Sequence, residues 1–304
     1  MKDAEARANG STVGGLGFLV GVVAAMSSMI VLQLGASLSK PAMEAYGALQ
    51  ITWLRLMWAA VLLLVFVRPK VLSYSRLQWK TALLLGAAIS VTNLCYYQSL
   101  LHLPIGIATS LEFIGPLSVS AFYLVRVNRA RIVWPAFASI GVLLLTTRQS
   151  SGGRFLVDWA EADALGVTWA LAAAFGWGSY VVFMKRTGNV FSGLEGLTMS
   201  LAAATAISAP FGLLGPGEGI SVEAVRAAFG LAILVPLLPY TLEMLALRRM
   251  HARVFAILMG VEPVISVIIG WIVLSQSLTT AQLAGVALVT IAILKVTQPK
   301  SDVA

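Results

Sequence analysis

Residues 254–274 read VFAILMGVEPVISVIIGWIVL, and residues 105–125 read IGIATSLEFIGPLSVSAFYLV. Each stretch is long enough to cross a bilayer as one helix. Each also carries a glutamate near its middle, Glu262 or Glu112, with a proline close by. An ionisable side chain at membrane depth costs about 3 kcal/mol or more, so it usually has a role. Two such segments in one chain are typical of a duplicated membrane protein whose site lies between the two halves.

The composition indicates an all-α integral membrane protein. The 304 residues are 59% hydrophobic and only 11% charged, whereas a soluble domain carries roughly 25% charged residues. The one cysteine, Cys95, excludes an internal disulfide, and the two histidines, His102 and His251, do not have metal-ligand spacing. The net charge of +8 comes from short loops, which is how insertion is oriented. We therefore expect the lipid bilayer, and no nucleic acid or metal, as a partner.

Ten apolar segments of roughly 20 residues are predicted to span the membrane. They lie at about 14–36, 46–67, 79–101, 104–125, 131–147, 162–184, 192–214, 227–247, 252–274 and 279–297. Sixteen of the 21 Lys and Arg residues fall in the two termini and in alternate loops, the opposite loops hold four, and Arg55 lies inside a span. By the positive-inside rule, this distribution places both termini in the cytoplasm.

An internal repeat is predicted from the same segments. Aligning the prolines of the two quoted stretches also aligns Gly141 with Gly285 after a gap of three residues. The repeats run from 14 to 148 and from 162 to 298, joined by a polar linker at 149–161. Each contains five spans, an odd number, so the two copies face opposite ways across the membrane. The expected fold is thus ten transmembrane helices in two inverted five-helix repeats, with an extracytoplasmic linker.

Four charged residues inside spans are candidates for the site. Glu112 and Glu262 each have two interpretations: a carboxylate that binds a substrate ammonium or carries a proton, or one that braces helices by pairing with Arg55. Arg55 could conversely grip a substrate carboxylate. Glu243 lies nearer the cytoplasmic end of its span, so it either contributes to the site or extends its head group to the interface.

Uncharged polar and aromatic residues form a second set of candidates for substrate binding. Members within a span lie three or four positions apart, on one helix face. They are Gln33 and Ser37, Asn93 and Tyr97, Trp177 and Tyr180, and Tyr240, which shares a face with Glu243. Such groups can hydrogen-bond a small zwitterion, but they also join helices, at about 0.6 kcal/mol each.

The sequence lacks the residues that other classes of function would need. An enzyme would need a nucleophile with a base or a motif such as H-E-x-x-H, and neither is present. No glycine-rich nucleotide loop occurs, so we expect no enzyme activity, no cofactor and no ATP-driven transport. A membrane sensor would need a sizeable soluble module, for which the loops are too short. Energy for transport would then come from the proton gradient, with Glu112, Glu243 or Glu262 carrying the proton.

Several motifs resemble a known family. The Glu262-Pro263 step, LSQSL at 274–278 and QLAG at 282–285 are similar to the EamA-domain branch of the drug/metabolite transporter superfamily. Within that branch, QLGASLSK at 33–40, LEFIGPL at 111–117 and LPYTLEM at 238–244 resemble the bacterial threonine/homoserine exporters.

The resemblance implies an inner-membrane antiporter that exports small amino acids by alternating access. The alternative is export of another small metabolite or a drug on the same scaffold. One position departs from the family pattern: Ser275-Gln276 stands where the family usually has a glutamate near the end of the ninth span.

Overall fold

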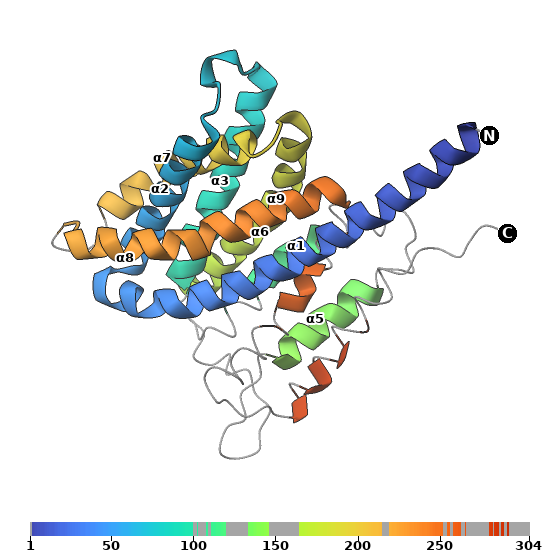
Figure 1. Ribbon diagram of the computed structural model, residues 1–304. Helices are drawn as coiled ribbons and strands as arrows, with labels where there is room; N and C mark the ends of the chain where they lie inside the picture. The colour runs from blue at the N-terminus through green and yellow to red at the C-terminus, as the bar shows by residue number, and fades with distance from the viewer. Residues whose placement is uncertain are drawn as a thin grey trace.

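The computed structural model describes residues 2–99, 111–119, 133–145, 164–214 and 219–251, with isolated positions at 102 and 108 and scattered ones from 254 to 291; side chains are described from Leu16 onward. Every element in these residues is helical (Figure 1). The elements are α1 (Lys2–Tyr46), α2 (Ala48–Val67), η1 (Val71–Ser73), α3 (Arg76–Ser99), α5 (Val133–Leu145), α6 (Ala164–Val190), α7 (Glu195–Leu213), α8 (Val222–Ala232), η4 (Ile233–Leu237), α9 (Leu238–Arg249) and η5 (Met259–Val261).

Five of the described helical stretches are long and apolar enough to cross a membrane. They are Leu16–Gly35, Ala48–Val67, Ala164–Val190, Glu195–Leu213 and Val222–Arg249. All five overlap predicted spans, and the all-helical membrane class is confirmed for the described residues. Much of the predicted fourth, ninth and tenth spans and the linker at 149–161 lie outside the described residues, so the ten-span count and the repeat stay predictions.

The first helix is longer than its apolar stretch. A loop was expected around Lys40, but α1 continues through Pro41 to Tyr46. Gly47 adopts a φ of 88°, and α2 begins at the next residue. The positive φ suits glycine, which has no Cβ to clash. The fall in hydropathy after Gly35 therefore does not end the helix, because the residues before Gly47 include good helix formers such as Ala42 and Met43.

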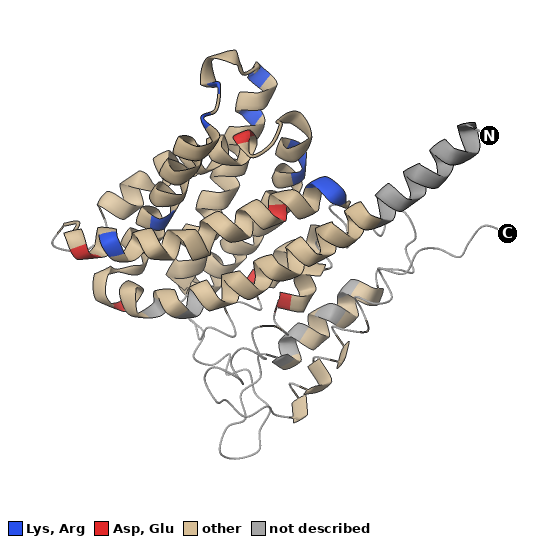
Figure 2. Cartoon of the chain, in the orientation of Figure 1, with Lys and Arg blue, Asp and Glu red and all other residues tan. Residues whose placement is uncertain are grey.

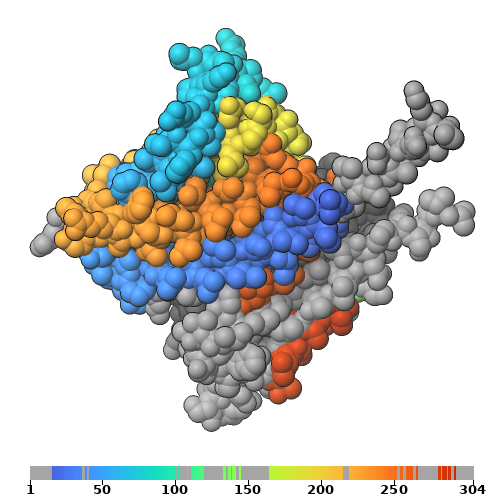
Figure 3. All heavy atoms as spheres, viewed as in Figure 1, coloured from blue at the N-terminus to red at the C-terminus, as the bar shows by residue number. Residues whose placement is uncertain are grey.

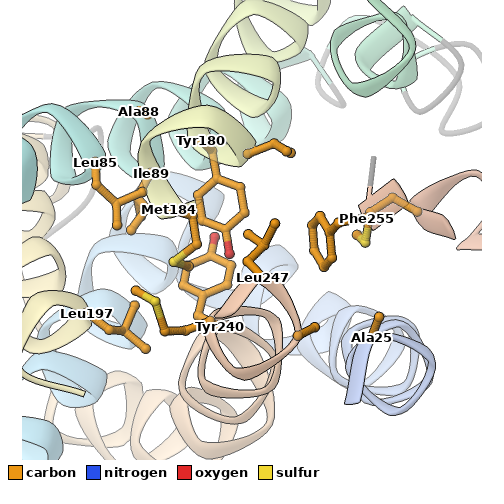
Figure 4. Packing of buried hydrophobic residues seen from close by; sticks show 14 of the residues in the cluster. Ala25, Leu85, Ala88, Ile89, Tyr180, Met184, Leu197, Tyr240, Leu247 and Phe255 are labelled. Atoms are coloured by element: carbon orange, nitrogen blue, oxygen red, sulfur yellow. The ribbon is translucent and has the colours of Figure 1, made fainter. Parts of the chain in front are cut away.

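Helices from the first half of the chain pack mainly against helices from the second half. Helix α3 packs against α6 and α7, α2 packs against α7 and α8, and α1 packs along α9. Figure 3 shows α1 lying beside the α8–α9 segment along much of its length. The largest buried apolar cluster of the described residues lies among α1, α2, α3, α6, α7 and α9. Figure 4 shows Tyr180 and Tyr240 side by side within this cluster, which places two hydroxyl groups in an otherwise apolar core.

The eighth predicted span is broken in the middle. Helices α8 and α9 are separated by the π-helical turn η4, where Val235 has an extended backbone (φ −149°, ψ 116°) before Pro236. Proline cannot donate a backbone hydrogen bond, and its ring clashes with the preceding turn. Helix α1 crosses close to this break at Gly35, where an added Cβ would lie 2.3 Å from Cγ2 of Val235.

Gly35→Ala is therefore expected to lower the thermal unfolding midpoint of the purified protein. Val235 is β-branched and stiff, so the new methyl must push α1 away from the break, at about 1–3 kcal/mol. Gly17→Ala on the same helix is the matched control, since nothing lies within 4 Å of its added Cβ. It should leave the midpoint unchanged or raise it slightly. Equal midpoints for the two variants would contradict the close approach.

The two ends of the bundle differ in charge. At one end, Tyr74 packs on Phe191 with ring centroids 5.0 Å apart, which joins the α2–α3 loop to the α6–α7 loop. Most of the Lys and Arg residues that the structure describes gather at this end (Figure 2). At the other end, Gln50 Nε2 donates to the Gly219 carbonyl at 3.3 Å.

Two cations tie α6 and α9 together at the basic end. Lys185 Nζ, on α6, donates to the carbonyl of Leu247 and, at 2.9 Å, to that of Met250. Arg248, on α9, donates from Nη2 to the carbonyl of Phe191 at 2.7 Å. The last carbonyls of a helix lack partners within it and carry partial negative charge. Lys185 thus stabilises the end of α9, and Arg248 makes the reciprocal contact just after α6.

Candidate functional site

Glu243 is fully enclosed by polar partners from two other helices. Its side chain is 2% exposed. Ser28 of α1 donates to Oε1 at 2.8 Å, and the Tyr180 hydroxyl of α6 donates to Oε2. The head group therefore does not extend to the interface, and this alternative from the sequence is wrong. Because both oxygens are hydrogen-bonded inside the protein, Glu243 joins α1, α6 and α9.

A second polar contact lies next to Glu243. Asn93 of α3 donates from Nδ2 to the Tyr240 hydroxyl at 2.8 Å and also to the Ile89 carbonyl at 2.8 Å. The ring of Tyr240 packs on that of Tyr180, with centroids 5.2 Å apart. A connected group of polar side chains thus runs from Asn93 through the two tyrosines to Glu243.

Arg55 is buried against a hydroxyl and an aromatic ring. Its side chain is 1% exposed. Nη1 donates to Ser39 Oγ at 2.8 Å, and Cζ lies 5.0 Å from the centroid of the Tyr97 ring, a favourable cation–π geometry. Nε has no partner among the described residues. No ion pair joins Arg55 to Glu112 or Glu262 in this part of the chain.

Glu262 is hydrogen-bonded on one side only. Gln33 of α1 donates to Oε1 at 3.0 Å. The carboxylate is 6% exposed, and Oε2 has no partner among the residues that the structure describes.

Glu112 lies beside an aromatic pair. Phe113 packs edge-to-face on Trp177, with ring centroids 5.8 Å apart. The Glu112 side chain is 9% exposed, and in the described part of the chain no hydrogen bond or ion pair reaches its carboxylate. Glu112 and Glu262 are near enough for their charges to interact, and so are Glu262 and Glu243. The three carboxylates thus share one region of the interior.

The structure brings nearly all predicted site residues into contacts with one another or with close neighbours. Four of these contacts join residues before 148 to residues after 162. They are Ser28 with Glu243, Gln33 with Glu262, Asn93 with Tyr240, and Phe113 with Trp177. The side chain of Ser37 lies outside the described residues.

Two serines in the site were not among the predicted residues. Ser28 binds Glu243, and Ser39 accepts from Arg55 while donating to the Gly35 carbonyl at 2.6 Å. Serines in membrane helices usually bond their own backbone, so neither differs from an ordinary helix serine in the sequence. No cluster of three or more potential metal ligands occurs among the described residues.

Charged and polar side chains buried between membrane-crossing helices are the arrangement of a multi-pass membrane transporter. Residues 164–298 match the EamA-like transporter family. The threonine/homoserine exporter RhtA of Escherichia coli (strain K12) is 33% identical over 263 residues, which cover 86% of this chain and 86% of that protein. RhtA of Salmonella typhimurium (strain SL1344) is 32% identical over 260 residues, covering 85% and 84%. The chain belongs to the EamA-like transporter family of the drug/metabolite transporter superfamily.

A solved crystal structure supports the same architecture. It superposes with a TM-score of 0.71 over 91% of this chain and 97% of its own, at 18% sequence identity. At this identity the likeness shows a shared fold alone. The predicted membership of the superfamily is confirmed by the family match and the RhtA relatives.

Proposed function

We propose that this protein exports small hydrophilic amino acids of the threonine and homoserine type across the bacterial inner membrane. The observation that carries the proposal is the identity of 33% to an RhtA exporter over 86% of the chain. The buried site is suited to such a substrate, because its donors and acceptors match a small zwitterion with a hydroxyl group. The transporter class argues against an enzyme, since transport needs only binding and conformational change.

Alternating access of two inverted five-helix repeats, at 14–148 and 162–298, is the proposed mechanism. The helix contacts support it. Exchanging the repeats maps α1 onto α6, α2 onto α7, and α3 onto the α8–α9 segment. The contact of α3 with α6 then corresponds to that of α1 with α9, and the contact of α3 with α7 corresponds to that of α2 with α8. The side-chain contacts across the repeats lie where the two would move against each other.

We place both termini in the cytoplasm and the linker at 149–161 outside it. The basic end of the bundle, which carries the α2–α3 and α6–α7 loops and the end of α9, is then cytoplasmic. The opposite end, with the Gln50–Gly219 contact, faces the periplasm.

Exchange against protons is the proposed source of energy. Glu112 is our choice of carrier, because no hydrogen bond holds its carboxylate to the described residues and it can change protonation without breaking a contact. Glu243 is bonded on both oxygens and instead positions Tyr180 and Tyr240 at the site. The remaining binding residues would be Gln33, Ser37, Asn93, Tyr97 and Trp177.

Substrate counterflow in proteoliposomes tests the function. Vesicles with the purified protein and internal unlabelled threonine should accumulate radiolabelled threonine and homoserine above empty vesicles. A proton ionophore should abolish net export driven by a pH gradient but leave counterflow intact. Counterflow with another metabolite, and none with threonine or homoserine, would support the alternative of a different substrate on the same scaffold.

A further inference from the structure

Four buried polar atoms of the described residues lack a hydrogen-bond partner. They are Tyr74 Oη, Arg248 Nε, Arg55 Nε and Glu262 Oε2. Tyr74 and Arg248 belong to the basic end of the bundle, outside the predicted spans, whereas Arg55 and Glu262 lie inside spans. A carboxyl group can become neutral by taking up a proton, but an arginine keeps its charge in a protein. Arg55 is therefore the group whose need for a partner cannot be removed by a change in protonation.

Arg55 has no counter-ion among the residues that the structure describes. None of the three buried carboxylates is affected by its charge. Its hydrogen bond goes to a neutral hydroxyl, that of Ser39. A buried ion without an opposite charge is strongly destabilising, and the Tyr97 ring offsets only part of this cost, because it carries no net charge. The position is thus suited to an anion that comes from outside the protein.

The free edge of Arg55 has the geometry that a carboxylate needs. Ser39 accepts from Nη1 at 2.8 Å. Nε and Nη2 form the opposite edge of the guanidinium, and neither donates to a described residue. Two parallel N–H groups on one edge match the two oxygens of a carboxylate. Because the Tyr97 ring lies 5.0 Å from Cζ, the guanidinium is held in place before any ligand binds.

The surroundings of Arg55 also favour an anion. The hydroxyl of Tyr240 accepts from Asn93 Nδ2 at 2.8 Å, so its own hydrogen remains available to an acceptor. Asn93 lies one helical turn before Tyr97 on α3, and the charge of Arg55 acts on the Tyr240 hydroxyl. A guanidinium and a hydroxyl that both have hydrogens to donate attract a negative group and repel a positive one.

Contacts link Arg55 to the break in the eighth predicted span. Ser39, which binds Arg55, donates to the Gly35 carbonyl at 2.6 Å. Gly35 in turn packs closely on Val235 in η4, and α2 itself packs against η4. Substrate sites in many transporters are formed at helices interrupted in this way. A ligand on Arg55 would therefore bind where the helices can respond to it.

We propose that the Nε–Nη2 edge of Arg55 binds the carboxylate of the transported amino acid. The proposal rests on the function proposed above, and it adds the chemical group of the substrate that is recognised and the residue that recognises it. An amine or a cationic drug without a carboxylate lacks the charge that this buried arginine requires. Arg55 thus selects amino acids over cationic molecules of similar size.

Binding by the purified protein in nanodiscs, measured by calorimetry, tests the proposal. The probes are L-threonine and threoninol, in which a hydroxymethyl group replaces the carboxylate. The wild type should bind threonine about tenfold or more tightly than threoninol. In Arg55→Gln, the affinity for threonine should fall to that for threoninol, which should itself stay unchanged. Arg76→Gln is the matched control, since Arg76 is exposed at the start of α3, and it should keep the wild-type preference.

Arg55→Lys is the second variant, for use if Arg55→Gln does not fold. It keeps the charge but lacks the planar edge, so it should lose most of the preference for threonine over threoninol. A folded Arg55→Gln variant that keeps the full preference overturns the proposal and leaves the exporter function intact. Repeating the titrations at low and high chloride separates the sources of the anion: a preference independent of Arg55, with wild-type binding that requires chloride, would assign a free anion to Arg55. A wild type that binds neither threonine nor homoserine overturns the proposed function itself.

Discussion

Glu112→Gln is expected to reduce threonine export to the level of cells that lack the protein. The substitution keeps the shape of the side chain but removes its ability to release a proton, so exchange against protons stops. Insertion and thermal stability should remain near the wild type, because no hydrogen bond or ion pair joins the Glu112 carboxylate to the described residues. Export assays in cells, together with the amount of protein in the membrane fraction, measure the two effects separately.

Counterflow distinguishes a proton carrier from a residue that binds substrate. Exchange of threonine for threonine needs no net proton movement, so Glu112→Gln should retain counterflow while losing net export. The control is Glu223→Gln, at the exposed start of α8, which should retain both. Loss of stability in Glu112→Gln, restored by adding Arg55→Gln, would contradict the assignment, since it would show that the two residues neutralise each other.

Glu243→Ala is expected to have the largest effect on stability among the site residues. It leaves the hydroxyls of Ser28 and Tyr180 without an acceptor in the core, at about 1–3 kcal/mol for each group, and adds the cost of a cavity. The unfolding midpoint in detergent should fall well below that of Glu223→Ala, which removes an exposed carboxylate. Glu243→Gln keeps one acceptor and should lie between them. A midpoint for Glu243→Ala equal to the control would show that this cluster does not hold α1, α6 and α9 together.

Much of the fold follows from the sequence because a bilayer sets the length of an apolar segment. The helices α2 and α7 begin and end within three residues of their predicted spans. The extension of α1 past Lys40 was missed, since hydropathy locates the membrane boundary and not the last helical residue. The break at Val235 was also missed. Pro236 is visible in the sequence, but whether a proline bends or interrupts a helix depends on what packs against it, here Gly35 of α1.

The sequence predicted which residues belong to the candidate site, but not which of them contact one another. Helical spacing placed Asn93 and Tyr97 on one face, and charge singled out Glu243 and Arg55. Partners such as Asn93 and Tyr240, which are 147 positions apart, depend on how helices pack, and periodicity within one helix carries no information about that. The interpretation in which Arg55 pairs with Glu112 or Glu262 followed charge alone. The structure instead places it on Tyr97 and Ser39, because a ring and a hydroxyl can also stabilise a guanidinium.

The hydrogen bonds that join α6 and α9 at the basic end constrain the donor residues more than the acceptor residues during evolution. Lys185 and Arg248 bind only backbone carbonyls, those of Leu247, Met250 and Phe191. Every amino acid supplies a carbonyl, so substitutions at these three acceptor positions leave the ties intact as long as the helices keep their course. Lys185 and Arg248, by contrast, cannot be replaced freely, because their charged side chains are the donors. Divergent members of the family should therefore keep a long basic side chain at both donor positions without any correlated change at the acceptors, and covariation between positions would not detect this link between α6 and α9.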